Sequence, residues 1–217
     1  MSIFGFNKFD IKGKNNIVVA VEDDKLFKLG RQEIRKLGKI KIHGNNNTIY
    51  VGLPLNPAHI NITILSDNNV VKFGKNCMVN DTYILMERGN GNYLCIGDNT
   101  YIQEIHIYIS AGAKCDIGKD CLISRNIQIW ASDFHALIDK KTKQVINIPH
   151  DSVAIGDHCW IGANAILTKR AKIPNNSVVA NSAVVSKAFY ETNTVFAGNP
   201  AKIVKRNIDW DKKIEIY

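Results

Sequence analysis

Apolar residues recur at every sixth position in the C-terminal part of the chain. This row comprises Ile155, Ile161, Leu167, Ile173, Val179 and Val185. A second row of small residues keeps the same spacing, at Cys159, Ala165, Ala171, Ser177 and Ala183. The period fits neither an α-helix, which repeats about every 3.6 residues, nor a long strand, which alternates every second residue. It is the period of a parallel β-helix, in which short strands are joined by tight turns.

Earlier segments keep this spacing but change phase between blocks. One block contains Ile117, Ile123 and Ile129, and another contains Ile96, Ile102 and Tyr108. The interval from Ile96 to Ile117 is not a multiple of six, which predicts an insertion or bulge near residues 109–114. Still earlier, segments 42–52 and 64–76 are rich in Asn, which suits looser coils with left-handed turn positions. We therefore predict a mainly β protein built of hexapeptide repeats.

The chain is long enough for one domain with a sizeable core, and we predict a single β-helix domain over residues 1–217. Residues 1–50 are expected to form irregular N-terminal coils, and residues 197–217 a short C-terminal segment. The most helix-like stretch is 22–38, where acidic residues precede apolar ones and basic residues follow. Gly30 interrupts this stretch, which leaves a short helix and a charged excursion of a coil as alternatives.

A long excursion separates two regular blocks. After Ile129 the next apolar position would be residue 135, but the spacing resumes only at Ile155. An irregular segment of about twenty residues in a compact fold is more often functional than a simple connector. We predict an extended loop over residues 134–152, with His135 at its base, where the rigid coils would hold a side chain best.

The formal net charge of +8 makes an anionic partner plausible. Basic residues are not interleaved with aromatic residues, so we expect no nucleic-acid partner. The five cysteines lack CxxC spacing, which favours buried thiols over a disulfide framework or a zinc site. The chain shows neither a secretory leader nor a membrane-spanning segment, so we expect a cytoplasmic protein.

Four segments in the C-terminal half resemble the hexapeptide-repeat acyltransferases. They are "SDFHALID" (132–139), "VAIGDHCWIGANAIL" (153–167), "NNSVVANSAVVSK" (175–187) and "VFAGNPAKIVKR" (195–206). The likeness covers about residues 96–206 and is to the branch of xenobiotic, galactoside and capsular-polysaccharide O-acetyltransferases. The N-terminal part is similar to enzymes that acetylate bacterial surface polysaccharides, sialic-acid capsules among them. This resemblance implies a left-handed β-helix, against the usual hand of parallel crossovers.

The resemblance places His135 on the family's catalytic histidine, the general base that takes the proton of an acceptor hydroxyl. It implies acetyl-CoA as the donor, direct transfer without an acyl-enzyme, and Trp160 beside the thioester, as part of the catalytic set. The backbone N–H of Ala163 would contact the pantetheine arm. Further cofactor-binding residues would be Asn181, Ser186 and Lys187, followed by Lys202 and Lys205 near the phosphates, where a point charge suffices.

Three more residues are weaker candidates for acceptor binding: Asp133, Glu104 and His106. Asp133 either orients the His135 ring or only forms a turn. His158 also lies near the predicted groove, and its position after Gly156 favours a solvated turn residue instead.

Three other functions are compatible with a β-helix. A zinc enzyme of the same fold would need histidine pairs that the sequence lacks, so no metal is expected. A noncatalytic scaffold would not need the loop, His135 and Trp160 together. An N-acetyltransferase acting on an amino sugar is the alternative to a sugar O-acetyltransferase, because one histidine base serves both acceptors.

The resemblance further implies a homotrimer with sites between protomers, and the charge is compatible with an acidic polysaccharide acceptor.

Overall fold

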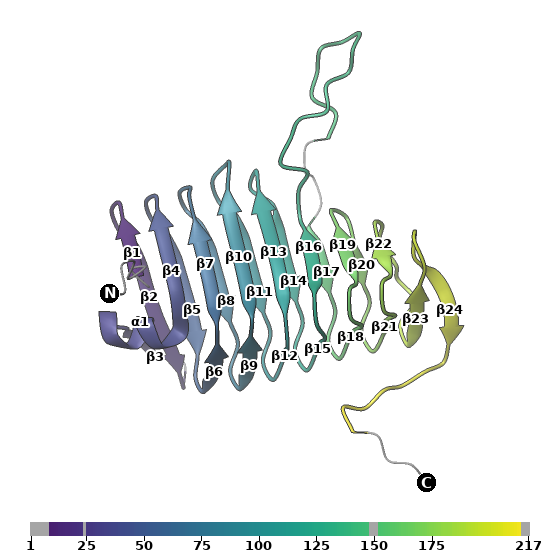
Figure 1. Ribbon diagram of the computed structural model, residues 1–217, viewed down its shortest axis with the longest axis horizontal. Coiled ribbons are helices and arrows are strands. Elements are labelled where there is room, and N and C mark those ends of the chain that lie inside the picture. Colours follow the sequence, from purple (N-terminus) through teal and green to yellow (C-terminus); the bar gives the residue numbers. More distant parts are fainter. Residues whose placement is uncertain (1–8, 24, 148–151, 214–217) are drawn as a thin grey trace, which may run out of the picture.

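The computed structural model describes residues 9–23, 25–147 and 152–213, and in it short strands stack along one axis as a parallel β-helix (Figure 1). Each complete coil contributes one strand to each of three sheets, which we call A, B and C. Sheet A contains β1 (Phe9–Lys12), β4 (Gly38–His43), β7 (Ile60–Ile64), β10 (Thr82–Glu87), β13 (Ile105–Ser110), β16 (Ile127–Trp130), β19 (Ile166–Thr168) and β22 (Val184–Val185).

Sheets B and C follow in the same coils. Sheet B contains β2 (Ile17–Glu22), β3 (Lys25–Lys28), β5 (Thr48–Gly52), β8 (Val70–Phe73), β11 (Tyr93–Ile96), β14 (Lys114–Ile117), β17 (Val153–Ile155) and β20 (Lys172–Ile173). Sheet C contains β6 (Leu55–Ala58), β9 (Cys77–Asn80), β12 (Tyr101–Ile102), β15 (Leu122–Ile123), β18 (Trp160–Ile161), β21 (Val178–Val179), β23 (Thr194–Ala197) and β24 (Lys202–Arg206). We name the turns between sheets the A–B, B–C and C–A corners.

The six-residue spacing arises because each side of a coil places one large apolar side chain in the interior. In sheet A, successive inward positions pair in register from Ile62 through Ile84 and Ile107 to Ile129, and all four are buried. The small residues of the second row are buried as well, since the interior is narrow at a corner. The mainly β fold predicted from the sequence is confirmed.

The N-terminal coils are longer than the C-terminal ones. Paired positions in sheet A are 22 residues apart at Ile62 and Ile84, but 18 apart at Leu167 and Val185. The insertion predicted near residues 109–114 lies at the A–B corner between β13 and β14, where the backbone φ of Ala111 is 58°. The predicted left-handed asparagines are also confirmed, with φ of 56° at Asn46, 58° at Asn68 and 56° at Asn76.

Asparagine also fills the interior of the A–B corner in the N-terminal coils. Asn47, Asn69 and Asn92 are fully buried. The Asn69 side-chain amide donates to Oδ1 of Asn47 at 2.7 Å, and that of Asn92 donates to Oδ1 of Asn69 at 2.9 Å. The stacked amides therefore satisfy one another's hydrogen bonds inside the core.

The two ends of the solenoid are closed differently. The segment predicted as helical divides into β3, which pairs antiparallel with β2, and the helix α1 (Arg31–Leu37) after Gly30. Leu26 is therefore in a strand and 61% exposed, whereas Ile34 of α1 is buried against the core. At the other end β24 pairs antiparallel with β23. In the described part of the chain, no helix is long and apolar enough to span a membrane.

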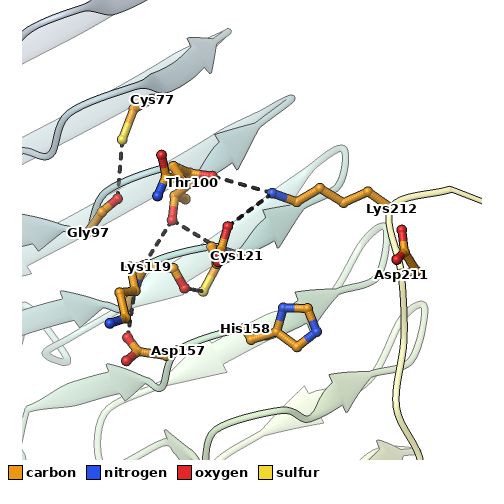
Figure 2. A network of polar contacts seen from close by, with 12 residues as sticks. Cys77, Gly97, Thr100, Lys119, Cys121, Asp157, His158, Asp211 and Lys212 are labelled. Atoms are coloured by element: carbon orange, nitrogen blue, oxygen red, sulfur yellow. Dashed lines mark hydrogen bonds and ion pairs between the residues drawn. The ribbon is translucent and has the colours of Figure 1, made fainter.

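Most cysteines lie inside the coils. Cys77, Cys115, Cys121 and Cys159 are buried free thiols, as predicted, while Cys95 is only partly buried. Figure 2 shows Cys77 and Cys121 among the polar contacts of neighbouring coils. The thiol of Cys77 donates to the Gly97 carbonyl at 3.2 Å, and that of Cys121 to the Gly156 carbonyl at 3.2 Å.

Candidate active site

His135 lies at the A–B corner, where the chain leaves β16 and rises as the extended loop (Figure 1). Asn147, on the returning limb, holds this base together. Its side-chain amide donates to Oδ2 of Asp133 at 2.7 Å and to the carbonyl of His135 at 2.8 Å, while its Oδ1 accepts from the backbone N–H of Leu137 at 2.7 Å. A residue far along the loop therefore fixes the backbone of His135.

Asp133 ties the loop to the next coil. Its Oδ2 also accepts from the ammonium group of Lys169, which follows β19. Partial burial acts to raise the pKa of Asp133, but the hydrogen bonds from Lys169 and Asn147 and the nearby positive charges hold that pKa below its usual value. The carboxylate is therefore engaged in anchoring the loop and stays ionised at neutral pH.

The His135 pocket is a cavity of about 200 Å³ at this corner, lined by Arg88, Ser132, Asp133, Phe134, His135 and Asn147. Arg88 donates from Nη1 to the carbonyl of Phe134 at 2.7 Å, which holds the backbone before His135 from a different coil. Within the described residues, the imidazole of His135 makes no hydrogen bond, and the residue is exposed. The ring is therefore open to accept a proton from an incoming group.

A second cavity lies on the outer face of sheet C. This Trp160 groove has a volume of about 430 Å³ and is lined by Trp160, Gly162, Val178, Asn181, Lys205 and Trp210. The indole N–H of Trp160 donates to Oγ of Ser124 at 3.2 Å, and the residue is 37% exposed. A Cβ at Gly162 would lie 2.5 Å from Oδ1 of Asn181, so glycine is required where the two coils meet.

The residues predicted from the sequence divide into two groups on this structure. His135 and Asp133 share the A–B corner with Ser186 and Lys187, which follow β22. The second group lies along sheet C and the C–A corner: Trp160, Ala163, Asn181, Lys202 and Lys205. The two groups stand at opposite edges of sheet A. In Figure 1 the loop rises on the side away from β18 and β21.

Of the three weaker candidates, Asp133 lines the His135 pocket, whereas Glu104 and His106 lie apart from both cavities. Glu104 lines a polar cavity of about 420 Å³ at the C–A corner, beside Arg125, whose guanidinium donates to Gln103 at 3.0 Å. His106 projects outward from sheet A, with its Nδ1 3.4 Å from the hydroxyl of Tyr108.

The interpretation of His158 as a solvated residue is wrong. His158 does occupy a turn, with φ of 53°, but its ring stacks on Trp210 with centroids 4.5 Å apart. The C-terminal segment covers it, and the spacing of the coils gives no sign of where that segment packs.

The Trp160 groove suits a long, partly apolar donor with phosphates at one end. Its floor is formed by Val178, Val195 and Trp160, and Lys205 supplies a cation at its rim. These are the features by which apolar pockets with a few placed charges bind cofactors. An apolar groove with a basic rim, together with a separate, loop-borne histidine, is the arrangement expected of a β-helix acyltransferase.

Comparisons with known proteins agree with this class. No family model matches the chain. A polysialic acid O-acetyltransferase of Neisseria meningitidis is 34% identical over 192 residues, which cover 79% of this chain and 88% of that protein. The crystal structure of the polySia-specific acetyltransferase NeuO is similar with a TM-score of 0.76 and 25% identity, over 95% of this chain and 89% of that one.

The polysialic acid O-acetyltransferase OatWY is also similar, with a TM-score of 0.61 and 26% identity, over 93% of this chain and 92% of that one. The chain therefore belongs to the hexapeptide-repeat acetyltransferase family that includes the polysialic acid O-acetyltransferases. It is an acetyltransferase with a left-handed parallel β-helix, as the resemblance implied.

Proposed function

We propose that this protein transfers an acetyl group from acetyl-CoA to a hydroxyl of an acidic bacterial surface polysaccharide, such as a sialic-acid capsule. The observation that carries the proposal is the His135 pocket. It holds the backbone of His135 through Asn147 and leaves the imidazole open. The acceptor class comes from the relatives, which act on polysialic acid.

In the proposed reaction, His135 is the general base. Acetyl-CoA supplies the acetyl group as an activated thioester. A neutral ring nitrogen of His135 takes the proton of the acceptor hydroxyl as the hydroxyl oxygen bonds to the acetyl carbon. The C–S bond of the thioester then breaks, and the imidazolium returns the proton to the departing CoA thiolate. Direct transfer is consistent with the cysteines, since no cysteine lines the His135 pocket in the described part of the chain. Burial raises the pKa of the Cys115 thiol, which makes it a poor nucleophile.

The working site is proposed to lie between two copies of the chain. The two groups of candidate residues stand at opposite edges of sheet A. A cyclic arrangement with sheet A toward the axis would place the A–B corner of one copy against the C–A corner of the next. Three copies, as the family resemblance implies, would give three equivalent sites.

The outer face of sheet A supports this arrangement. Tyr108 and Trp130 are register partners whose rings stack with centroids 4.1 Å apart, and Phe134 packs edge-on against Trp130 at 6.1 Å. Trp130 is still 37% exposed. On the loop, Leu137, Ile138 and Ile146 are 59%, 59% and 63% exposed. Exposed aromatic and aliphatic side chains gathered in this way mark a protein interface.

An acidic acceptor fits the charge of the chain, because a formal net charge of +8 attracts a polyanion. Arg88 brings a positive charge to the rim of the His135 pocket. A cytoplasmic location belongs to the same proposal, because that is where acetyl-CoA is available.

The test measures thiol release from acetyl-CoA against sialylated oligosaccharides, neutral sugars and amino sugars, with His135→Ala beside the wild type. Turnover with a hydroxyl-only sialylated acceptor, lost in the variant, would establish the proposed activity. Turnover with amino sugars alone would establish N-acetyl transfer instead. A chain that binds no CoA would be a scaffold and not an enzyme of this class.

A further inference from the structure

The chain after β24 crosses the outside of the solenoid as a strap, residues 207–213. The strap is attached at both ends. Near its start, Ile208 donates its backbone N–H to the Asn193 carbonyl at 3.1 Å and accepts from the Asn193 side chain at 3.1 Å. Near its other end, Nζ of Lys212 lies 3.4 Å from the Asn99 carbonyl and 3.7 Å from Oδ1 of Asp120.

These anchors belong to coils that are well separated along the axis. Asn193 precedes β23, whereas Asn99 precedes β12, and β15, β18 and β21 lie between them. With about 4.8 Å between neighbouring strands, the strap spans roughly 19 Å along the B–C corner. Figure 1 shows this segment running back from β24 beneath the coils, and Figure 2 shows Lys212 reaching toward the turns that carry Thr100 and Cys121.

Trp210, at the centre of the strap, is held in one orientation by His158. The two rings are stacked, with an angle of 14° between them. The indole N–H donates to the His158 carbonyl at 2.9 Å, and Nε2 of His158 lies 3.2 Å from the Trp210 carbonyl. These contacts hold the indole ring of Trp210 against the turn that carries His158. The Trp210 ring also lines the Trp160 groove, where its centroid lies 6.2 Å from that of the Trp160 indole, with an angle of 42° between the rings.

The strap gives the groove its outer wall. The floor comes from outward residues of sheet C, among them Trp160 and Val178, and a sheet face alone would be open. Ile208, Asp209 and Trp210 close it on one side. The two indoles are in contact with each other and together form an apolar surface along which an alkyl and amide chain can lie, because aromatic rings bury large apolar areas at a small cost in conformational entropy. Asp209 would repel phosphate, and Lys205 would attract it.

We propose that Trp210 is a donor-binding residue that contacts the pantetheine arm of acetyl-CoA beside Trp160, and that His158 is its positioning residue. This inference rests on the proposed use of acetyl-CoA as donor. It extends the donor site beyond the residues predicted from sequence, onto a segment outside the regular coils.

The test is the affinity for CoA, measured by isothermal titration calorimetry on the full-length wild type and single variants. Trp210→Ala should weaken CoA binding about tenfold, and Trp210→Phe should stay within about threefold of the wild type because it keeps a ring. His158→Ala should weaken binding by a smaller factor than Trp210→Ala. Lys213→Ala is the matched control, because it changes an exposed side chain of the strap that neither lines the groove nor belongs to the anchors described above, and its CoA affinity should equal that of the wild type.

Steady-state kinetics supply the second readout. Trp210→Ala should raise the KM for acetyl-CoA and leave kcat at saturating donor within about twofold. A chain ended after Asn207 should lose at least as much CoA affinity as Trp210→Ala, and melting temperatures identify any variant that fails to fold. Unchanged affinity in both variants would overturn the inference, and so would tighter binding, which would make the strap an obstruction. A wild type that binds no CoA would instead overturn the proposed donor, and the role of Trp210 with it.

Discussion

The His135 pocket and the Trp160 groove are built by different means. The pocket is formed by one irregular excursion, and polar contacts from Asn147, Lys169 and Arg88 keep its shape. The groove is formed by regular coils and is mostly apolar, with Trp160 as its largest floor residue. The excursion offers a group that can exchange a proton, whereas the coils offer a surface that can hold a donor. In this molecule the proposed chemistry and the proposed donor binding are therefore separable by mutation.

The largest expected effect comes from His135→Ala. Removal of a general base should lower kcat about 10²-fold or more, while the Kd for CoA stays unchanged because the ring lies outside the groove. Stopped-assay turnover and calorimetry on the same preparation measure the two quantities. A loss of CoA affinity as large as the loss of turnover would show that pocket and groove are not separate.

Mixing two inactive variants tests whether pocket and groove come from different copies. His135→Ala and Trp160→Ala, refolded together, should regain activity, because a copy with an intact pocket can face a copy with an intact groove. With equal amounts and random assembly, about a quarter of the sites would be intact. The control mixes His135→Ala with itself. No recovery in mixed oligomers, verified by differential tags, would place the whole site within one chain.

A smaller effect is expected at the rim of the groove. Lys205→Ala and Lys202→Ala should each raise the KM for acetyl-CoA several-fold by removing attraction for phosphate, with kcat little changed. Raising the salt concentration should shrink the difference from wild type, since exposed charges are screened. Lys143→Ala, a change in the loop, serves as the matched control. A lower kcat with an unchanged KM for acetyl-CoA would show that these lysines do not bind the donor.

The smallest effect concerns the anchor of the loop. The pKa of Asp133 is lowered in the folded protein, so its contribution to stability is present above the unfolded value near 3.9 and is lost as the pH falls through the folded value. With its side chain 35% exposed, the pair with Lys169 should contribute no more than about 1 kcal/mol.

Asp133→Asn should therefore lower the melting temperature slightly at pH 7 and by less at pH 2, because the wild type loses this contribution as the pH falls through the folded pKa. Thermal unfolding at the two pH values measures this. Glu22→Gln, which changes an exposed carboxylate at the end of β2, is the control. An equal loss at both pH values would mean that the carboxylate charge is not what anchors the loop.

The sequence predicts the coils well because every coil fills the same narrow interior with the same kinds of side chain. One inward apolar residue per side and a small residue at the corner suffice to define the register, as at Ile161 and Ala165. The position of His135 was predictable for the opposite reason, since it stands where the repeat stops. Asn147, Lys169 and Trp210 could not be predicted in this way. Their contacts join segments that no period relates, such as Trp210 and His158, 52 residues apart.

The loop leaves and rejoins the solenoid without disturbing it. Ile117 pairs with Ile155, Ile123 with Ile161, and Ile129 with Leu167, so all three sheets continue in register across the insertion. The β-helix therefore hardly restricts the length and sequence of the loop between its two limbs. In evolutionary terms this segment can gain, lose or exchange residues between its limbs while the coils on either side keep their register.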